Sequence, residues 1–369
     1  MKRLVHIAAT RLGRPMTDDD VRHNGNIFNI LRLVFASAVI FSHAYVLGGF
    51  SDPSAAELPF SVSRFAVLLF FTLSGFLVTN SLQSRGVRQF ARARALRMLP
   101  GLWVMLLVTA AVTTLAFGTL PAAALPGNAS LWQYLARNGL LIGKHYSIDG
   151  VFAGNPLPFT INGSLWTIPR EVHCYIALAL VGAIGLLSRR HVLLGLYLAG
   201  TAIVMLMPLA LLPPVLVPQV TTLGPLLISF FAGVLLFLHR DRVFLSWPLA
   251  GLAITLVALV DAGAWRGLAA QFTAAYVALV VAVLVPAALK RISQRLPDYS
   301  FGIYIYGFPV QQAMIATGIG ATPGLNMVTT LVFVVPLAAL SWHVIEKPAL
   351  AFKDRRRPPR PAAPDALAG

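Results

Sequence analysis

Few ionisable side chains lie within the apolar segments of this sequence, and their types and spacing are suited to group transfer. Arg32 and His43 lie in the first apolar segment, eleven residues apart. At about 100° per residue, this spacing puts both on one helix face, about 16 Å apart. A charged group in hydrocarbon costs about 2.5–3.5 kcal/mol, so a functional role is expected for it. His43 is a candidate general base, and Arg32 is a candidate ligand for an anionic group.

A second polar group, Arg94 and Arg97, precedes and opens the third apolar segment. The i, i+3 spacing aligns the two guanidinium groups on one helix face. Guanidinium groups bind phosphate oxygens in a bidentate manner, so the pair predicts a site for a phosphorylated cofactor that arrives from the cytosol. On spacing alone, anchoring of the helix at the cytoplasmic boundary is an equally good explanation.

Glu171, in the fourth apolar segment, is expected at the level of His43. If the fourth segment starts near residue 165, Glu171 lies about 9 Å below the outer surface and His43 about 7.5 Å below it. A carboxylate beside an imidazole can fix the tautomer of the ring and stabilise the imidazolium, so the two are predicted to form a catalytic pair. Alternatively, Glu171 pairs with Arg170 or Arg64. His173, two residues further on, faces another side and is read as structural.

The composition indicates what positions these residues. Of 369 residues, 57% are hydrophobic and 11% are charged, with a mean hydropathy of +0.75, whereas a globular domain has about 25% charged residues. A soluble enzyme is therefore excluded, and an all-α polytopic membrane protein is predicted. About ten transmembrane helices are expected, at residues 27–48, 64–82, 98–118, 165–187, 192–212, 223–238, 243–260, 268–289, 300–318 and 327–345.

The charge pattern predicts the topology. Basic residues recur at alternate junctions between the apolar segments, so the positive-inside rule places both termini in the cytoplasm. The net charge of +16 therefore reflects topology and not a nucleic-acid partner. We expect a basic cytoplasmic arm at residues 1–25, a transmembrane domain at 26–350 and a Pro/Arg-rich cytoplasmic tail at 351–369. Arginines 355–357 of this tail are expected to attract anionic membrane lipid.

Two further features bear on function. Residues 119–164 form one long connection on the outer side, rich in Pro, Gly and Asn, and long loops of this kind tend to be functional. It is expected to be a lid or a cradle for an acceptor. The single cysteine, Cys174, lies within an apolar segment and is expected to be a packed core residue and not a nucleophile.

Taken in order, the motifs resemble those of the acyltransferase family 3 membrane proteins, over residues 26–350. The motifs are Arg32 with His43, Arg94-x-x-Arg97, the Phe70–Phe76 segment Phe-Phe-Thr-Leu-Ser-Gly-Phe, Ser164-Leu165-Trp166 followed by Glu171 and Tyr175, Tyr299–Tyr304, and Glu346-Lys347-Pro348. Two positions depart from the family pattern. Gly307 stands where many relatives have histidine, and Phe301 stands where tyrosine is common. Position 307 therefore cannot act in catalysis here.

The resemblance implies a membrane-bound O-acyltransferase of the bacterial inner membrane that modifies cell-envelope glycans such as lipopolysaccharide. It implies acyl-CoA, most simply acetyl-CoA, as the donor, with its phosphates bound by Arg94, Arg97 and Arg32. His43, oriented by Glu171, would act as the base or as the acyl carrier. The acceptor would be a hydroxyl of an extracytoplasmic or lipid-linked sugar. No metal is expected.

Two other functions are compatible with a protein of many transmembrane helices that contain few charged residues. One is a secondary transporter or exporter of a glycan precursor. Coupled transport usually needs titratable carboxylates within the bundle, and the candidates are Glu171 and Asp261. The other is a structural partner that scaffolds a glycan-synthesis complex.

Overall fold

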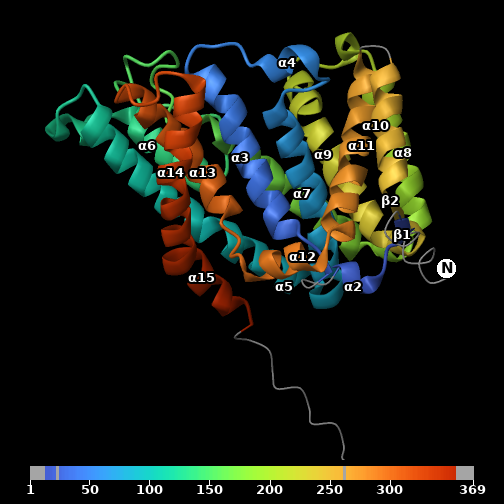
Figure 1. Cartoon of the computed structure of the whole chain (residues 1–369). Helices are drawn as coiled ribbons and strands as arrows, with labels where there is room; N and C mark the ends of the chain where they lie inside the picture. Colours follow the sequence, from blue (N-terminus) through green and yellow to red (C-terminus); the bar gives the residue numbers. More distant parts are fainter. Residues whose placement is uncertain (1–12, 22–24, 261–262, 355–369) are drawn as a thin grey trace, which may run out of the picture.

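The computed structural model describes residues 13–21, 25–260 and 263–354, and these residues form a bundle of helices (Figure 1). Asp261 and most of the predicted amino-terminal arm and carboxy-terminal tail lie outside them. The first helices are α2 (Asp18–Val21), α3 (Phe28–Leu47), α4 (Pro53–Glu57), α5 (Val62–Phe117), α6 (Ala129–Gly139), α7 (Ile168–Ala183) and α8 (Arg190–Leu206). The remaining ones are α9 (Val217–Leu238), α10 (Trp247–Leu259), α11 (Ala264–Leu284), α12 (Ala287–Arg295), α13 (Ser300–Ala316), α14 (Pro323–Ser341) and α15 (Lys347–Ala351).

Each of the ten expected apolar ranges contains a helix, so the all-α class is confirmed. Five helices in the described residues are long and apolar enough to cross a membrane, and they belong to α3, α5, α9, α11 and α14 with its extension to Ala351. Helices α7, α8, α10 and α13 are shorter than the ~20 residues of a simple crossing. The number of ten spans and the side of the membrane on which each end lies stay predictions.

Helix α5 holds two of the expected spans in one 56-residue element. Its helical geometry is broken at Gly86, where φ is 75° and ψ is 168°. Only glycine adopts this conformation readily, because it has no Cβ. Gly86 therefore reverses the chain between the segment with Ser74 and the segment with Arg94 and Arg97.

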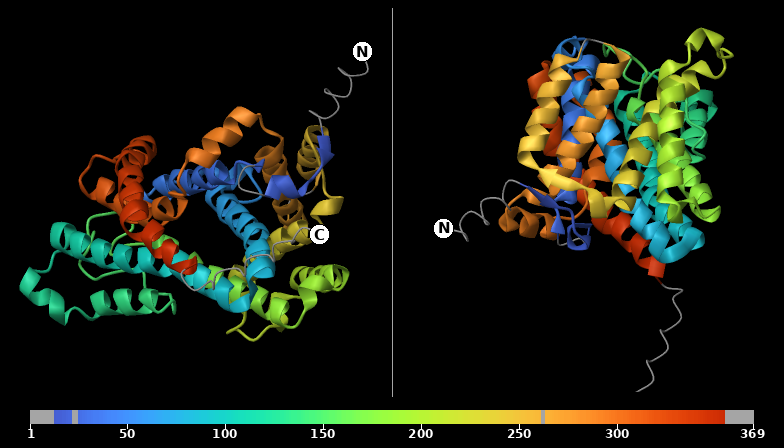
Figure 2. Two further views of the ribbon diagram at one scale, coloured as in Figure 1. Left: turned by 90° about the horizontal axis from the view of Figure 1, so that it is seen from below. Right: turned by 90° about the vertical axis from the view of Figure 1, so that its right-hand side faces the viewer.

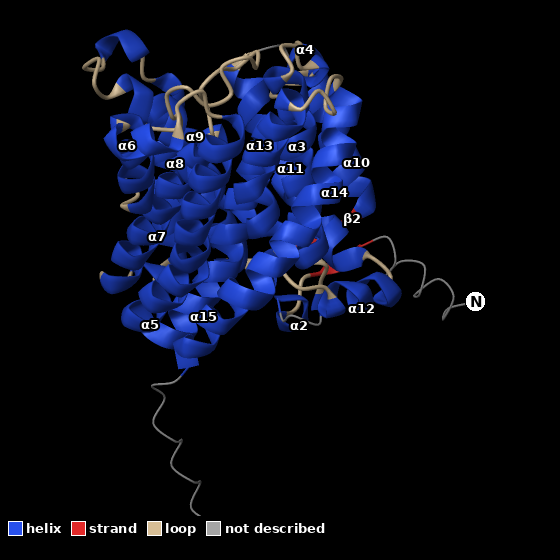
Figure 3. Ribbon diagram, turned by 90° about the vertical axis from the view of Figure 1, so that its left-hand side faces the viewer, coloured by secondary structure: helices blue, strands red, loops and turns tan. Residues whose placement is uncertain are grey.

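The two ends of the bundle differ in structure (Figures 1 and 3). At one end, here named the α12 end, lie α2, α12, α15 and a two-stranded antiparallel sheet of β1 (Gly13–Pro15) and β2 (Phe244–Ser246). At the opposite end, named the α4 end, lie α4 and most of the irregular loops. Viewed along the helices, α6 lies at the margin of the bundle beside the second half of α5 (Figure 2).

The connection 119–164 does not stay at the surface of the bundle. Asn162 is fully buried, and its side-chain amide donates to the carbonyl of Ile305, at 2.7 Å, in the middle of α13. Asn155 likewise donates to the side chain of Gln312 on α13 at 2.8 Å. A 3₁₀ turn, Gly163–Thr167, follows inside the protein, so α7 begins well below the α4 end.

Helices α5 and α9 cross at two glycines, next to Ser74 of α5. A Cβ on Gly75 would lie 2.0 Å from the carbonyl oxygen of Phe230, and one on Gly233 would lie 1.9 Å from that of Thr72. Small residues allow such close approach of helix backbones.

Gly75→Ala is therefore expected to destabilise the protein by about 1–3 kcal/mol, because the helices must separate. Gly195→Ala in α8 is the matched control, since its Cβ meets nothing within 4 Å. Thermal unfolding in detergent should show a clear loss for Gly75→Ala and no loss for Gly195→Ala. Equal unfolding temperatures would contradict the close-contact explanation.

Candidate active site

A cavity of about 470 Å³ lies toward the α12 end of the bundle, and we name it the arginine cavity. Its walls come from α3, both halves of α5, α7, α13 and the carboxy-terminal segment. Its charged lining residues are Arg32, Arg94, Arg97, Lys353, Glu171 and Asp298. Four cationic side chains thus face two carboxylates, which gives the lining an excess of positive charge.

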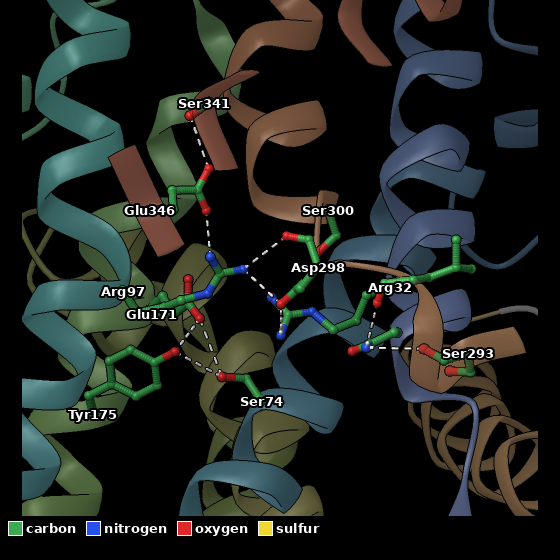
Figure 4. A network of polar contacts seen from close by, with 12 residues as sticks. Arg32, Ser74, Arg97, Glu171, Tyr175, Ser293, Asp298, Ser300, Ser341 and Glu346 are labelled. Carbon is green, nitrogen blue, oxygen red and sulfur yellow. Dashed lines mark hydrogen bonds and ion pairs between the residues drawn. The ribbon is translucent and has the colours of Figure 1, made fainter. Parts of the chain in front are cut away.

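Arg97 is the centre of a buried ion-pair network (Figure 4). Its guanidinium donates to Glu346 at 2.5 Å and to Asp298 at 2.7 Å. Arg32 pairs with the same Asp298 oxygen at 3.1 Å. Ser341 donates to the second oxygen of Glu346 at 3.0 Å. Arg97 is therefore already neutralised by protein carboxylates, and these contacts join α5 to the segment before α13 and to the π-helical turn Trp342–Glu346 after α14.

Asp298 lies just before α13, and its carboxylate is 15% exposed. Burial disfavours its ionised form, but the charges of Arg32 and Arg97 and a 2.5 Å hydrogen bond from Ser300 outweigh this effect. They hold the pKa of Asp298 well below its usual range. Asp298 is thus ionised at neutral pH.

Arg94 differs from Arg97 because no carboxylate of the described residues pairs with it. Its guanidinium lies 5.9 Å from the centre of the Tyr175 ring, and its Nε is buried without a hydrogen-bond partner. The Nε of Arg32 is in the same state. The arginine cavity therefore has hydrogen-bond donors that remain available to a ligand. They belong to Arg94, Arg32 and Lys353, the last from the 3₁₀ turn that ends the described chain.

Glu171 lies in the same cavity and contacts two hydroxyl groups. It accepts a hydrogen bond from Tyr175, one turn further along α7, and one from Ser74 of α5 at 3.3 Å. Ser74 and Tyr175 are themselves 3.1 Å apart. All three side chains appear together in Figure 4. They form a polar patch on the wall opposite the ion-pair network.

His43 lines a second, smaller cavity of about 190 Å³ nearer the α4 end, which we name the histidine cavity. The imidazole packs edge-on against Phe308, with ring centres 5.5 Å apart, and no side chain or backbone group of the described residues hydrogen-bonds it. Polar groups around this cavity include Ser61, Ser63 and Arg64. An unbonded imidazole beside an open space is free to meet a ligand.

The carboxylate near His43 is Asp52, in the segment between α3 and α4. Asp52 accepts hydrogen bonds from Ser42, the neighbour of His43, and from Ser54 at 2.6 Å. Partial burial opposes ionisation of Asp52, but these bonds and the nearby imidazole lower its pKa. The sequence reading did not include Asp52.

The predicted contact between Glu171 and His43 is wrong. The two residues line different cavities, and Glu171 contacts Tyr175 and Ser74 instead. The cause is the path of residues 155–167, which enter the bundle before α7 begins. The prediction assumed that residue 165 lies at the outer surface. Because residue 165 lies inside the protein, Glu171 lies deeper than predicted. It pairs with neither Arg170 nor Arg64.

The structure does bring the three predicted cofactor ligands, Arg32, Arg94 and Arg97, to one cavity. Their binding of a cofactor stays a prediction. Gly307 faces the side chain of Ile40, with 3.2 Å between that side chain and a Cβ at position 307. Cys174 is a free, buried cysteine, as expected of a core residue.

Sequence reasoning missed Asp298, Glu346 and Lys353 as cavity or network residues. A signal existed for Asp298, because it precedes the ninth apolar segment at the level at which Arg32 and Arg97 were placed. Opposite charges at one level of a bundle are expected to pair. Lys353 had been assigned to the tail, whereas residues 347–354 fold against α5, where Arg92 donates to the carbonyl of Phe352 at 2.8 Å.

Comparison with known proteins found two relatives that cover most of the chain. The chain is 29% identical over 341 residues to an O-acetyl transferase of Shigella phage Sf6, with 88% of this chain and 96% of the phage protein covered. It is 29% identical over 361 residues to nodulation protein 10 of Rhizobium leguminosarum bv. viciae, with 92% and 96% covered. No solved structure matched the chain.

Residues 26–343 match the acyltransferase domain that defines acyltransferase family 3. This range contains both cavities except for the contribution of residues 344–354. The sequence motifs, the helical bundle and the two relatives agree with the match. The chain therefore belongs to acyltransferase family 3.

Proposed function

We propose that the protein transfers an acyl group, most simply acetyl, from acyl-CoA in the arginine cavity to a sugar hydroxyl at the histidine cavity. The supporting observation is that a cavity with four cationic groups adjoins the cavity of an unbonded histidine. The phosphates of the donor would meet Arg94, Arg32 and Lys353. The likeness to an O-acetyl transferase supports the same reaction class.

In this reaction the sugar oxygen attacks the thioester carbonyl, so that a C–O bond forms and the C–S bond breaks. His43 accepts the hydroxyl proton and returns it to the leaving thiolate, which gives the O-acyl sugar and the free thiol of CoA. Transfer through an acyl-histidine is the variant of this scheme. In this scheme Asp52 would favour the imidazolium through its negative charge, and Glu171 would contact the donor.

We further propose that the α12 end faces the cytoplasm of a bacterium, with the protein in the inner membrane. The donor would then enter from the cytosol, and the acceptor would be an extracytoplasmic or lipid-linked sugar. The basic residues Arg190, Arg240 and Lys290 support this orientation, because they lie at the α12 end, where anionic lipid would also be met.

The test of the function is acyl transfer by purified protein in lipid vesicles. Acetyl-CoA labelled in its acetyl group and an envelope glycan are supplied, and the labelled product is identified by mass. We expect the glycan to gain the mass of one acyl unit, with one CoA thiol released for each transfer. Counterflow of a glycan precursor across the vesicle without acylation would instead support an exporter.

Arg94 provides a specific test of the donor site. Arg94→Gln should weaken acetyl-CoA binding about 10- to 100-fold, because a charge-assisted hydrogen bond is worth about 1.5–3 kcal/mol. Its thermal stability should remain close to that of the unaltered protein, because Arg94 forms no ion pair with a described carboxylate. Titration calorimetry in detergent measures the affinity.

Arg88→Gln is the matched control, since Arg88 is an exposed arginine of the same helix that lines neither cavity. It should bind acetyl-CoA unchanged. Equal affinities of the two variants would favour boundary anchoring as the role of Arg94.

A further inference from the structure

Two residues, Val67 of α5 and Tyr304 of α13, line both the arginine cavity and the histidine cavity. They therefore stand between the two spaces. A group that extends from the region of Arg94 to His43 has to pass between or beside them.

Tyr304 is held firmly at this place. Its hydroxyl oxygen lies 2.7 Å from the hydroxyl of Thr167 and donates to the carbonyl of Ser164 at 3.2 Å. Its ring packs edge-on against Phe70, with centres 6.0 Å apart. Val67, on the other helix, is 8% exposed and has a stiff, branched side chain. The walls of the passage are thus fixed from two helices and from the 3₁₀ turn before α7.

The histidine cavity beyond the passage is small, at about 190 Å³, against about 470 Å³ for the arginine cavity. On the proposed function, this space has to hold the acyl group and admit the attacking hydroxyl. Each methylene added to the acyl chain then has to fit beside Val67 and Tyr304 or displace the acceptor. A rigid apolar site discriminates about 10- to 200-fold for one methylene.

We propose that Val67 and Tyr304 form a constriction that limits the length of the transferred acyl chain and so selects acetyl over longer groups. The proposal rests on the proposed function, because it assigns the specificity of that reaction. Tyr304 acts here through the shape of its ring, which its hydroxyl contacts hold in place. Val67 acts through its branched side chain on the opposite wall.

The experiment compares kcat/KM for acetyl-CoA and butyryl-CoA with one glycan acceptor. Unaltered protein should prefer acetyl-CoA. Val67→Ala should raise the butyryl-to-acetyl ratio about tenfold or more. Val234→Ala is the matched control, because Val234 is a fully buried valine of α9 that lines neither cavity. Its ratio should equal that of unaltered protein.

A second pair of variants keeps the test decisive if Val67→Ala does not fold. Tyr304→Phe keeps the ring but removes the contacts to Thr167 and Ser164, so the ratio should rise. Tyr306→Phe on the same helix lines neither cavity and should leave it unchanged. An unaltered ratio in active Val67→Ala or Tyr304→Phe protein would overturn the constriction while leaving the acyltransferase function standing. Loss of transfer from every acyl-CoA in unaltered protein would instead overturn the function itself.

Discussion

Changing His43 to glutamine is expected to lower the rate of acyl transfer about 100- to 10,000-fold, the range that a positioned general base contributes. Glutamine keeps much of the volume and polarity of the side chain but cannot take up the hydroxyl proton. Acetyl-CoA affinity should change little, because only the acyl group of the proposed donor would reach His43, which does not line the arginine cavity. The measurement is single-turnover transfer to a defined glycan at saturating donor, together with donor binding.

His173→Gln is the matched control for this experiment. His173 is exposed and lines neither cavity, so its replacement should leave transfer intact. If His43→Gln protein transfers acetyl at the rate of His173→Gln protein, His43 is neither the base nor the acyl carrier.

The second large effect is expected at Asp298. Asp298→Asn should reduce the free energy of unfolding by about 3–5 kcal/mol, the usual consequence of removing one partner from a buried ion pair. Arg32 and Arg97 would lose a shared carboxylate, and Glu346 alone would remain beside Arg97. Thermal or denaturant unfolding in detergent measures the loss. Asp241→Asn is the control, because Asp241 is 55% exposed in its pair with Arg190, and water screens an exposed pair, so its replacement should leave the unfolding transition almost unchanged.

The stabilisation by Asp298 should also depend on pH. Its folded-state pKa is lowered, so its contribution is complete above the unfolded-state value of about 3.9 and decreases as the pH falls toward the folded-state value. The unaltered protein should therefore lose stability below about pH 4 more steeply than Asp298→Asn protein. Parallel pH profiles of the two proteins would show that Asp298 is not a stabilising carboxylate.

The helices could be predicted from the sequence because an apolar run of sufficient length has one solution in lipid, in which the helix bonds its own backbone. For the same reason Arg32, Arg94 and Arg97 could be assigned to one level of the bundle. The boundary between the segments 64–82 and 98–118 could be predicted from the polar residues between the two apolar runs, whereas its place at Gly86 could not. These features follow from local pattern and length.

The position of Glu171 could not be predicted, because it depends on contacts between distant parts of the chain. Asn155 and Asn162 draw the long connection into the bundle by hydrogen bonds to α13, about 150 residues later. The periodicity of the sequence does not predict such contacts. The pairing of Arg97 with Glu346 is equally non-local. The observed partners of Glu171 and Glu346 could therefore not be predicted from the sequence.

The small sheet at the α12 end has a consequence for biosynthesis. Within the described part of the chain, strand β1 pairs only with β2, and Asp18 accepts a hydrogen bond from Arg240, 222 residues further along the chain. While the ribosome is still translating the intervening helices, the flank of the first helix has no partner to fold against. The nascent chain therefore forms the β1–β2 pair and the Asp18–Arg240 contact late, after α9 has been synthesised.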